Sequence, residues 1–328
     1  MESTTIKRLA VLTSGGDAPG MNAAIRGVVR TAHYHKLDVY GIFRGYQGMI
    51  EGDLQRLDVR KVGNILHRGG TILKTARSEA FRTASGRHAA FEALQAFEID
   101  AVITIGGDGT LTGAHTFTGE YPINFVGIPG TIDNDLYGTD NTIGFDTACN
   151  TALEAIDRIR DTADSHNRLF FIEVMGRHSG FIALNSGIGG GAGSVLIPES
   201  GTSLDDLVEK LRKDYRRKKL FSLVVVAEGN RLGGAATVAQ MVQERLDVYD
   251  TKVTIIGHLQ RGGAPTCFDR VLASKLGYGA VEGLLNGTRN CMVGLINNKL
   301  TYTPLEQVIQ QPKPLDQDLM RMADILAM

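Results

Sequence analysis

Short apolar runs that end in glycine turns recur along this chain, and they constrain its fold more than any other feature. The clearest run, Ala101 to Ile105, leads into Gly106-Gly107-Asp108-Gly109-Thr110. A β-branched run of this length predicts a strand buried on both faces of a parallel sheet. Glycines at its exit let backbone N–H groups approach a polyphosphate, and a following helix N-terminus favours negative charge.

Asp108 in this turn suits Mg²⁺, a hard cation usually held by one or two carboxylates and phosphate oxygens. For the motif taken alone, a tight turn with a helix-capping aspartate is an equally good interpretation. The chain opens on the same arrangement, because the apolar residues 9–12 and the glycine turn 13–20 precede a helical pattern from Met21 to His35. Two such turns fit a doubly wound α/β sheet that binds its ligand at the carboxyl edge. The chain has neither the GxGxxG spacing of dinucleotide-binding folds nor a GxxxxGK[ST] loop.

Further strands, each followed by a polar or glycine turn, are predicted at residues 39–43, 125–128, 169–174, 195–199, 222–227 and 253–256, and residues 44–48 are predicted to form a loop. Helical spacing predicts helices at residues 147–162, about 204–215, 269–285 and 304–328, with apolar stripes that include Leu207, Val208 and Leu211 in the second and Leu319, Met322, Ala323 and Leu326 in the last. The turn after 125–128 contains Asp133 and Asp135. A carboxylate at a strand's carboxyl end, beside a phosphate-binding turn, is suited to act as a general base, and an Asx-turn is the alternative. Arg177 and Arg261 follow other strands, where a guanidinium can bind phosphate with two N–H groups.

Composition limits the partners. Lysine and arginine total 35 and aspartate and glutamate 36, so the 328 residues carry a net charge of −1. No overall basic field is available to attract nucleic acid or an anionic membrane, and we expect neither partner. The three cysteines are far apart and outside any metal-ligand spacing, and the start of the chain has no apolar signal core. We expect a cytoplasmic globular protein with two domains or one large α/β unit.

Six segments, taken together, resemble the ATP-dependent 6-phosphofructokinases of the bacterial type over essentially the whole chain. They are LTSGGDAPGMNAAIRG at residues 12–27, IGGDGT at 105–110, PGTIDND at 129–135, IGFDTA at 143–148, EVMGRHSG at 173–180 and GHLQRGG at 257–263. The order of the last segments is close to diagnostic, whereas IGGDGT alone is shared with other kinases.

The resemblance implies two doubly wound, Rossmann-like α/β/α domains with mainly parallel sheets. The larger, ATP-binding domain is expected to span residues 1–142 and about 253–303, and the smaller, fructose 6-phosphate-binding domain residues 143–252 and about 304–328. The implied reaction transfers the γ-phosphoryl of ATP to the 1-hydroxyl of D-fructose 6-phosphate and leaves ADP, with Mg²⁺ as cofactor. Members of the family are homotetramers with shared active sites, and we expect the same assembly here.

The same resemblance implies the site residues, position by position. Asp133 is expected to accept the hydroxyl proton and Asp108 to bind Mg²⁺, and we expect these two carboxylates to face each other across a gap the size of a terminal phosphate. ATP is expected to contact Gly16, Arg77, Ser78, Gly107, Asp108, Gly109 and Thr110. Fructose 6-phosphate is expected to contact Thr131, Ile132, Asp133, Asp135, Arg168, Met175, Gly176, Arg177, Glu228, Lys252, His258, Leu259, Gln260 and Arg261.

Two glycines favour ATP over pyrophosphate as the phosphoryl donor. Pyrophosphate-dependent relatives typically carry Asp where this chain has Gly109 and Lys where it has Gly130, and those side chains would fill the space of the nucleotide. A pyrophosphate-dependent kinase is the alternative enzyme. A catalytically silent sensor of sugar phosphates or nucleotides is the alternative outside enzymes, although both Asp108 and Asp133 are present.

The chain departs from the family pattern at three positions. Lys252 replaces a substrate-binding arginine and lacks its bidentate fork, which predicts weaker binding of the sugar phosphate. Val59 and Gly193 stand where regulated members have an arginine and a metal-ligating glutamate of the effector site. The residues that still resemble this pocket for ADP or phosphoenolpyruvate are Arg26, Arg30, Arg160, Arg217 and Lys219. We expect an anion site with weakened or altered regulation.

Overall fold

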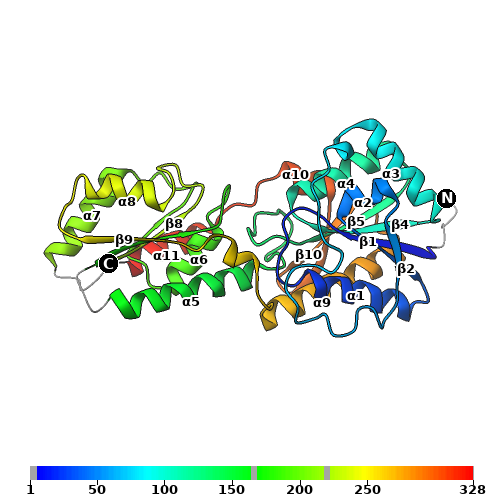
Figure 1. The fold of residues 1–328 in the computed structure, drawn as a ribbon, viewed down its shortest axis with the longest axis horizontal. Helices are drawn as coiled ribbons and strands as arrows, with labels where there is room; N and C mark the ends of the chain where they lie inside the picture. The colour runs from blue at the N-terminus through cyan, green and yellow to red at the C-terminus, as the bar shows by residue number, and fades with distance from the viewer. Residues whose placement is uncertain (1–5, 164–167, 218–221, 328) are drawn as a thin grey trace. The chain divides into compact units, whose positions relative to one another are not determined.

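A computed structural model describes residues 6–163, 168–217 and 222–327 (Figure 1). The chain divides into two compact units, each with a mainly parallel sheet between two layers of helices. The first unit combines the described parts of Met1–Ile132, Leu136–Asp146 and Arg261–Lys313, and the second those of Asp133–Asp135, Thr147–Gln260 and Pro314–Met328. The predicted α/β fold class is confirmed.

The sheet of the first unit has seven strands, in the order β11 (Lys299–Pro304), β10 (Cys291–Ile296), β5 (Asn124–Pro129), β4 (Ala101–Gly106), β1 (Arg8–Thr13), β2 (Asp38–Ile42) and β3 (Leu54–Leu57). The edge strands β3 and β11 run antiparallel to their neighbours, and the other strands are parallel. The sheet grows from β1 in both directions, because β2 pairs with one side of β1 and β4 with the other. The carboxyl ends of β1 and β4 are therefore the switch point at which open α/β sheets bind their ligands.

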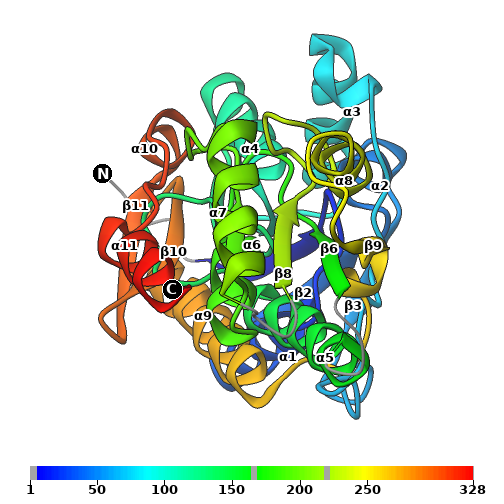
Figure 2. The same cartoon turned by 90° about the vertical axis from the view of Figure 1, so that its left-hand side faces the viewer.

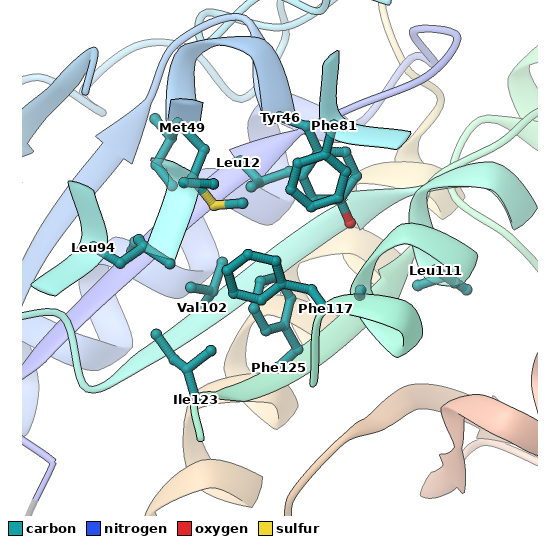
Figure 3. Packing of buried hydrophobic residues seen from close by; sticks show 14 of the residues in the cluster. Leu12, Tyr46, Met49, Phe81, Leu94, Val102, Leu111, Phe117, Ile123 and Phe125 are labelled. Carbon is teal, nitrogen blue, oxygen red and sulfur yellow. The ribbon is translucent and has the colours of Figure 1, made fainter. Parts of the chain in front are cut away.

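Helices cover both faces of this sheet (Figure 1). One face carries α1 (Met21–Tyr34) and α9 (Cys267–Leu285), and the other carries α2 (Gly45–Glu51), α3 (Ala84–Ala96), α4 (Asp108–Glu120) and α10 (Leu305–Gln310). Figure 3 shows the core beneath the second set, where Phe117 of α4 packs against Phe125 of β5 with 5.6 Å between ring centroids. Tyr46 of α2 stacks on Phe81 at 4.0 Å in the same cluster. Burial of each such ring stabilises the fold by about 1.5–3 kcal/mol.

The sheet of the second unit is wholly parallel, in the order β7 (Ser194–Leu196), β8 (Ser222–Ala227), β6 (Arg168–Val174) and β9 (Asp250–Ile255). Figure 2 shows β8, β6 and β9 side by side. One face packs against α7 (Leu204–Arg216) and α8 (Ala235–Gln243). The other side holds α5 (Phe145–Ala163), α6 (Phe181–Gly189) and α11 (Gln317–Leu326) (Figure 1).

Local chemistry explains where α7 begins. The Ser203 hydroxyl accepts a hydrogen bond from Asp206 N at 3.2 Å, and Ser203 N donates to Asp206 Oδ2 at 3.2 Å, which is a reciprocal capping box. The predicted apolar stripe of this helix, with Leu207, Val208 and Leu211, is buried against the sheet.

The units differ from the expected domain limits at two places. The strand predicted near 253–256 was expected to rejoin the first domain, but β9 pairs with β6 along its whole length, from Arg168 opposite Asp250 to Glu173 opposite Ile255. The chain enters the first unit again only at Arg261. Residues 304–313 were assigned to the second domain, whereas Leu305 and Val308 of α10 are buried in the core cluster of the first unit. Strand pairing decides the first limit and helix packing the second, and no local pattern reveals either partner.

Other expectations about single elements were wrong. Residues 44–48 were expected to form a loop, but helix α2 begins at Gly45. The C-terminal helix was expected to close the core with an apolar stripe, but no described residue of α11 is buried, and Met322 and Leu326 are 39% and 68% exposed. The hairpin of β10 and β11 was not predicted, although its turn residues Asn297 and Asn298 both adopt positive φ, as a tight two-residue turn requires.

Candidate active site

Two glycine turns meet at the switch point of the first unit. Ser14 N donates to Ile105 O at 3.0 Å, which extends the pairing of β1 and β4 beyond the strands themselves. A Cβ added to Gly15 would lie 3.3 Å from Thr110 Oγ1, and one added to Gly106 would lie 2.6 Å from Ser14 O. The two turns expected to hold ATP are therefore in contact.

Helix α4 presents its N-terminus at this edge. Asp108 is its first residue, and both Asp108 and Gly109 are exposed. A Cβ on Gly109 would meet nothing within 4 Å, so the space beside this turn is open. Unpaired N–H groups in the first turn of a helix favour an anion such as a phosphate.

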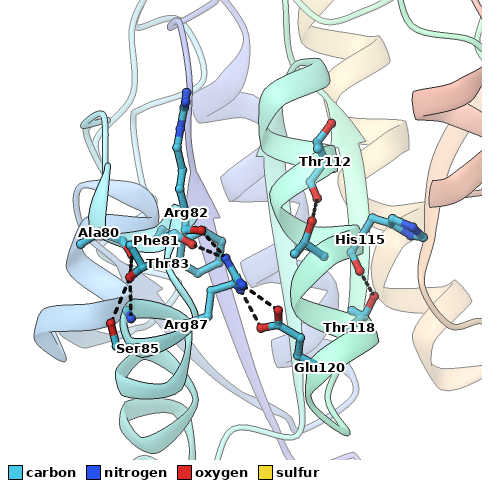
Figure 4. Close-up of polar contacts among 12 residues, drawn as sticks. Ala80, Phe81, Arg82, Thr83, Ser85, Arg87, Thr112, His115, Thr118 and Glu120 are labelled. Carbon is cyan, nitrogen blue, oxygen red and sulfur yellow. Dashed lines mark hydrogen bonds and ion pairs between the residues drawn. The ribbon is translucent and has the colours of Figure 1, made fainter.

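Side-chain hydrogen bonds hold both ends of α4. Tyr46 O–H donates to Thr110 O at 2.6 Å, and burial raises the pKa of the Tyr46 phenol, so it stays a donor. At the other end, Arg87 Nε and Nη2 donate to the two carboxylate oxygens of Glu120, each at 2.6 Å (Figure 4). The bond from Arg87 holds the pKa of the Glu120 carboxyl below its ordinary value. Helix α4, whose first turn is expected to face phosphate, is therefore held by side chains outside that turn.

Arg77 and Ser78, expected at the nucleotide, and Thr131 and Ile132, expected at the sugar phosphate, lie in the same unit. Arg77 is exposed, and the Ser78 hydroxyl donates to Gln47 Oε1 at 2.7 Å, which ties this loop to α2. Thr131 follows β5 and lies beside Gly107, where an added Cβ would be 3.4 Å from that of Thr131. Ile132 is fully buried, so only its backbone is placed to meet a ligand.

Arg261, which is expected to contact the sugar phosphate, lies against the first glycine turn, which is expected to hold ATP. Its Nη1 donates to Asp17 O at 3.3 Å, and a Cβ on Gly16 would lie 2.7 Å from the same atom. Glycine at position 16 thus leaves room for the guanidinium to lie against the turn.

The second unit gathers a different set at the carboxyl ends of β6 and β8. Glu228 N donates to Val174 O at 2.9 Å, which places Glu228 next to the turn of Met175, Gly176 and Arg177. The Ser179 hydroxyl donates to Asp133 O at 3.1 Å, so the expected base belongs to this group. Arg177 and Glu228 are exposed, and Asp133 and Asp135 are partly exposed.

The short 3₁₀ helix Gly257–Arg261 divides its residues between surface and core. His258 and Leu259 are exposed. Gln260 is fully buried, because its side chain accepts from Met175 N at 2.7 Å and donates to Ala148 O at 3.3 Å. Its side chain therefore positions the turn at Met175 and does not face solvent.

Some residues that were expected to act together belong to different units. Asp108 lies in the first unit, whereas Asp133 and Asp135 lie in the second, and their expected approach across a phosphate-sized gap stays a prediction. The expected effector arginines divide in the same way, with Arg26 and Arg30 in the first unit and Arg160 and Arg217 in the second. Lys219 lies outside the described residues.

The model of the phosphofructokinase family matches residues 8–284. The chain belongs to the phosphofructokinase family. It is 54% identical over 321 residues to the ATP-dependent 6-phosphofructokinase of Cytophaga hutchinsonii, with 98% of each chain covered. It is also 54% identical to the ATP-dependent 6-phosphofructokinase 1 of Thermus thermophilus, over 98% of this chain and 100% of that one.

Solved phosphofructokinases share the fold. The T-state enzyme of Pichia pastoris superimposes with a TM-score of 0.88 at 38% identity, covering 93% of this chain, which spans 35% of the Pichia chain. A pyrophosphate-dependent phosphofructokinase of Marinobacter aquaeolei gives a TM-score of 0.83 at 26% identity, over 98% of this chain and 92% of that one. The phosphofructokinase fold expected from the sequence is confirmed.

The expected Mg²⁺ fits what the first unit offers. Among the described residues, no group of three or more His, Cys, Asp or Glu side chains could hold a metal ion. Mg²⁺ commonly takes one or two protein carboxylates and completes its shell with phosphate oxygens and water. The exposed Asp108 at a helix N-terminus that also favours phosphate meets this requirement. The described helices include none with the length and apolarity to cross a membrane.

The sequence did not predict two buried hydrogen bonds that support this candidate site. Thr142 Oγ1 donates to Thr131 O at 2.6 Å, and Gly144 N donates to Asp269 Oδ1 at 2.9 Å. Asp269 is fully buried in the first turn of α9. The IGFDTA motif was the available signal, because its glycine adopts φ +100°, but the partner of that glycine is far away in the sequence. The segment holds the turn that leads to Asp133.

We expect Gly144→Ala to lower the free energy of unfolding by about 1–3 kcal/mol, because its positive φ strains any other residue. The new methyl group would also lie 2.7 Å from Ala18 Cβ and 3.2 Å from Ile132 Cγ2. Chemical denaturation measures the change. Gly119→Ala in α4 is the control, since the added Cβ would meet nothing within 4 Å. Alanine is more favourable than glycine in a helix by up to about 1 kcal/mol, so this variant should be as stable as the wild type or more stable. Equal effects of the two substitutions would contradict the role given to Gly144.

Proposed function

We propose that this chain transfers the γ-phosphoryl of ATP to the 1-hydroxyl of D-fructose 6-phosphate, giving fructose 1,6-bisphosphate and ADP. The observation that carries this proposal is the full-length 54% identity to relatives named ATP-dependent 6-phosphofructokinase. The chain is accordingly a glycolytic kinase. The paired glycine turns at the switch point support it, since they offer N–H groups and an exposed carboxylate to a polyphosphate.

Two glycines support ATP over pyrophosphate as donor. Open space surrounds Gly109, so no side chain at this position fills the room beside the turn. A Cβ on Gly130 would lie 2.9 Å from Ile105 Cγ2 and 3.1 Å from Met21 Cε, so the lysine of pyrophosphate-dependent relatives would disturb the packing here. Retention of both Asp108 and Asp133 argues against a silent sensor.

A coupled assay with Mg²⁺ and fructose 6-phosphate tests the donor. We expect turnover with ATP and turnover at least tenfold lower with pyrophosphate at the same concentration, because a tenfold difference requires only about 1.4 kcal/mol of transition-state stabilisation. Comparable or faster turnover with pyrophosphate would overturn the choice of donor. Binding of fructose 6-phosphate without turnover of either donor would favour the sensor.

The proposed mechanism divides the work between residues of the two units. The 1-hydroxyl oxygen forms a bond to the γ-phosphorus, the bond from that phosphorus to the β–γ bridging oxygen breaks, and the hydroxyl proton passes to the Asp133 carboxylate. Mg²⁺ at Asp108 supplies positive charge to the phosphate oxygens. Arg77 and Arg261 neutralise further charge, and the glycine turns position the donor, which is most of what phosphoryl transfer requires.

We expect Asp133→Asn to lower kcat by about 10²–10⁴-fold, since the amide cannot accept the proton. The dissociation constant of fructose 6-phosphate, measured by calorimetry without ATP, should stay within about threefold. Asp247→Asn, an exposed carboxylate of the same unit, serves as the control with wild-type rates. A large rise in KM with nearly normal kcat would instead give Asp133 a binding role.

We further propose a cytoplasmic homotetramer with shared active sites, in which the protein binds fructose 6-phosphate and ATP or ADP but no nucleic acid or membrane. Exposed apolar residues support the assembly, since Phe268, Val271 and Tyr278 form a stripe along α9 and Val253 and Ile255 are exposed on the edge strand β9. No disulfide joins the cysteines of the described chain, which suits a reducing compartment.

Regulation is proposed to be weak. Burial and the neighbouring Arg30 lower the pKa of Arg26, so two cations on α1 lie close together and favour an anion. Arg160 packs against Gly191, where an added Cβ would be 2.8 Å from Nη2. Val59 and Gly193 supply neither the guanidinium nor the carboxylate of regulated members.

We therefore expect ADP to change the half-saturating concentration of fructose 6-phosphate by less than about fivefold, below the usual range of allosteric coupling. Saturation curves with and without ADP measure this change. A larger shift would show that regulation survives the loss of these two groups.

A further inference from the structure

Asp250 lies between two cations that are expected to bind the phosphate of the sugar substrate. Strands β6 and β9 lie side by side (Figure 2). They pair in parallel, with Arg168 opposite Asp250. Lys252 is two residues further along β9 and so projects from the same face as Asp250. Lys252 Nζ lies 2.7 Å from Asp250 Oδ1, and Arg168 Nε lies 3.1 Å from Asp250 Oδ2. Each carboxylate oxygen therefore contacts one cation.

All three side chains reach solvent at the edge of the sheet. Arg168, Asp250 and Lys252 have side chains that are 26%, 51% and 48% exposed. Ladder pairing already joins β6 to β9 along six residue pairs, so the strands do not need this carboxylate to stay together. Exposed ion pairs contribute little to stability. The contacts with Lys252 and then Arg168 lower the pKa of Asp250, which keeps it ionised at neutral pH.

The two cations keep donors for a second anion. A guanidinium has five N–H groups and an ammonium three, and Asp250 engages Nε of Arg168 and one donor of Lys252. With Asp250 ionised, the cluster carries one net positive charge in place of two. A phosphate monoester near pH 7 carries a charge of about −1.5 to −2, so it interacts with a weaker positive field than the two cations alone would offer.

We propose that Asp250 sets the affinity for the phosphate group of fructose 6-phosphate by competing with it for Lys252 and Arg168. This inference rests on the proposed function, which makes both cations substrate ligands. Asp250 sets the affinity for the substrate and takes no part in phosphoryl transfer. It also supplies a counter-charge while the site is empty, which disfavours the retention of inorganic phosphate.

The direction in which one substitution changes the affinity for fructose 6-phosphate distinguishes this role from a structural one. If Asp250 held the cations in a productive arrangement, its loss would weaken the binding of substrate. If it competes with the phosphate, its loss strengthens binding. Asp250→Asn keeps the shape of the side chain and removes the charge.

We expect Asp250→Asn to lower the half-saturating concentration of fructose 6-phosphate about 3- to 10-fold, since two exposed ion pairs are lost and each typically changes an equilibrium by about 1.5- to 5-fold. Calorimetry without ATP should show the same factor in the dissociation constant. Inorganic phosphate should also compete better with fructose 6-phosphate. Asp250→Ser is a second neutral variant, with the same decrease expected.

The control is Asp205→Asn, which removes an exposed carboxylate of the same unit that pairs with Arg245. We expect its half-saturating concentration to match the wild type. In a Lys252→Ala background, Asp250→Asn should lower the half-saturating concentration of fructose 6-phosphate by a smaller factor, because one of the two competing contacts is already absent.

An unchanged or raised half-saturating concentration in both neutral variants would overturn the inference, as would an equal decrease in Asp205→Asn. Failure of the proposed function is a different outcome, because the wild type would then neither bind nor phosphorylate fructose 6-phosphate in the same assays. Tighter binding of inorganic phosphate by Asp250→Asn, measured by calorimetry, reports on the competition even without turnover.

Discussion

The parallel pairing of β1 with β4 is the contact on which the rest of the phosphofructokinase site depends. It puts two glycine turns side by side at one edge, so α1 and α4 both begin there. The N–H groups of two helix N-termini are thus available to the one polyphosphate that we propose to bind here. Alternate residues of a strand face opposite sides, so a slip of one residue would exchange the side chains that β1 packs on its two buried faces. The continuous burial of both strands therefore protects the register that the site needs.

Groups expected to meet reactants are mostly exposed, whereas the groups that hold them are buried. Asp108 and His258 reach solvent, but Tyr46, Gln260 and Asp269 are buried and spend their polar atoms on the backbone of neighbouring turns. A buried polar group loses free energy if its partner moves away, so such bonds restrict a turn to one conformation. Rigid support of this kind suits a reaction whose main requirement is the positioning of charged reactants.

Much of the fold could be predicted because its signals are local. The strands β4 and β5 and the helices α1, α5, α7 and α9 lie close to the expected ranges, since continuous apolar runs and helical spacing act within a few residues. Domain limits could not be predicted in the same way, because β9 is assigned by its pairing with β6. The roles of Asp269 and Gln260 were missed because their partners Gly144 and Met175 lie 125 and 85 residues away.

The amino-acid sequence alone determined the family, the fold class and the turns that carry Asp108 and Asp133, because each depends on short motifs whose chemistry is local. Tertiary structure decided which polar residues are supports and which are exposed, and it placed Asp250 between Arg168 and Lys252. The pairing of β6 with β9 brings residues 168 and 250 together across 82 positions. Charges that are distant along the chain interact only after the pairing of the strands has set their separation, and that is why no local pattern reveals the competition that we propose for the sugar phosphate.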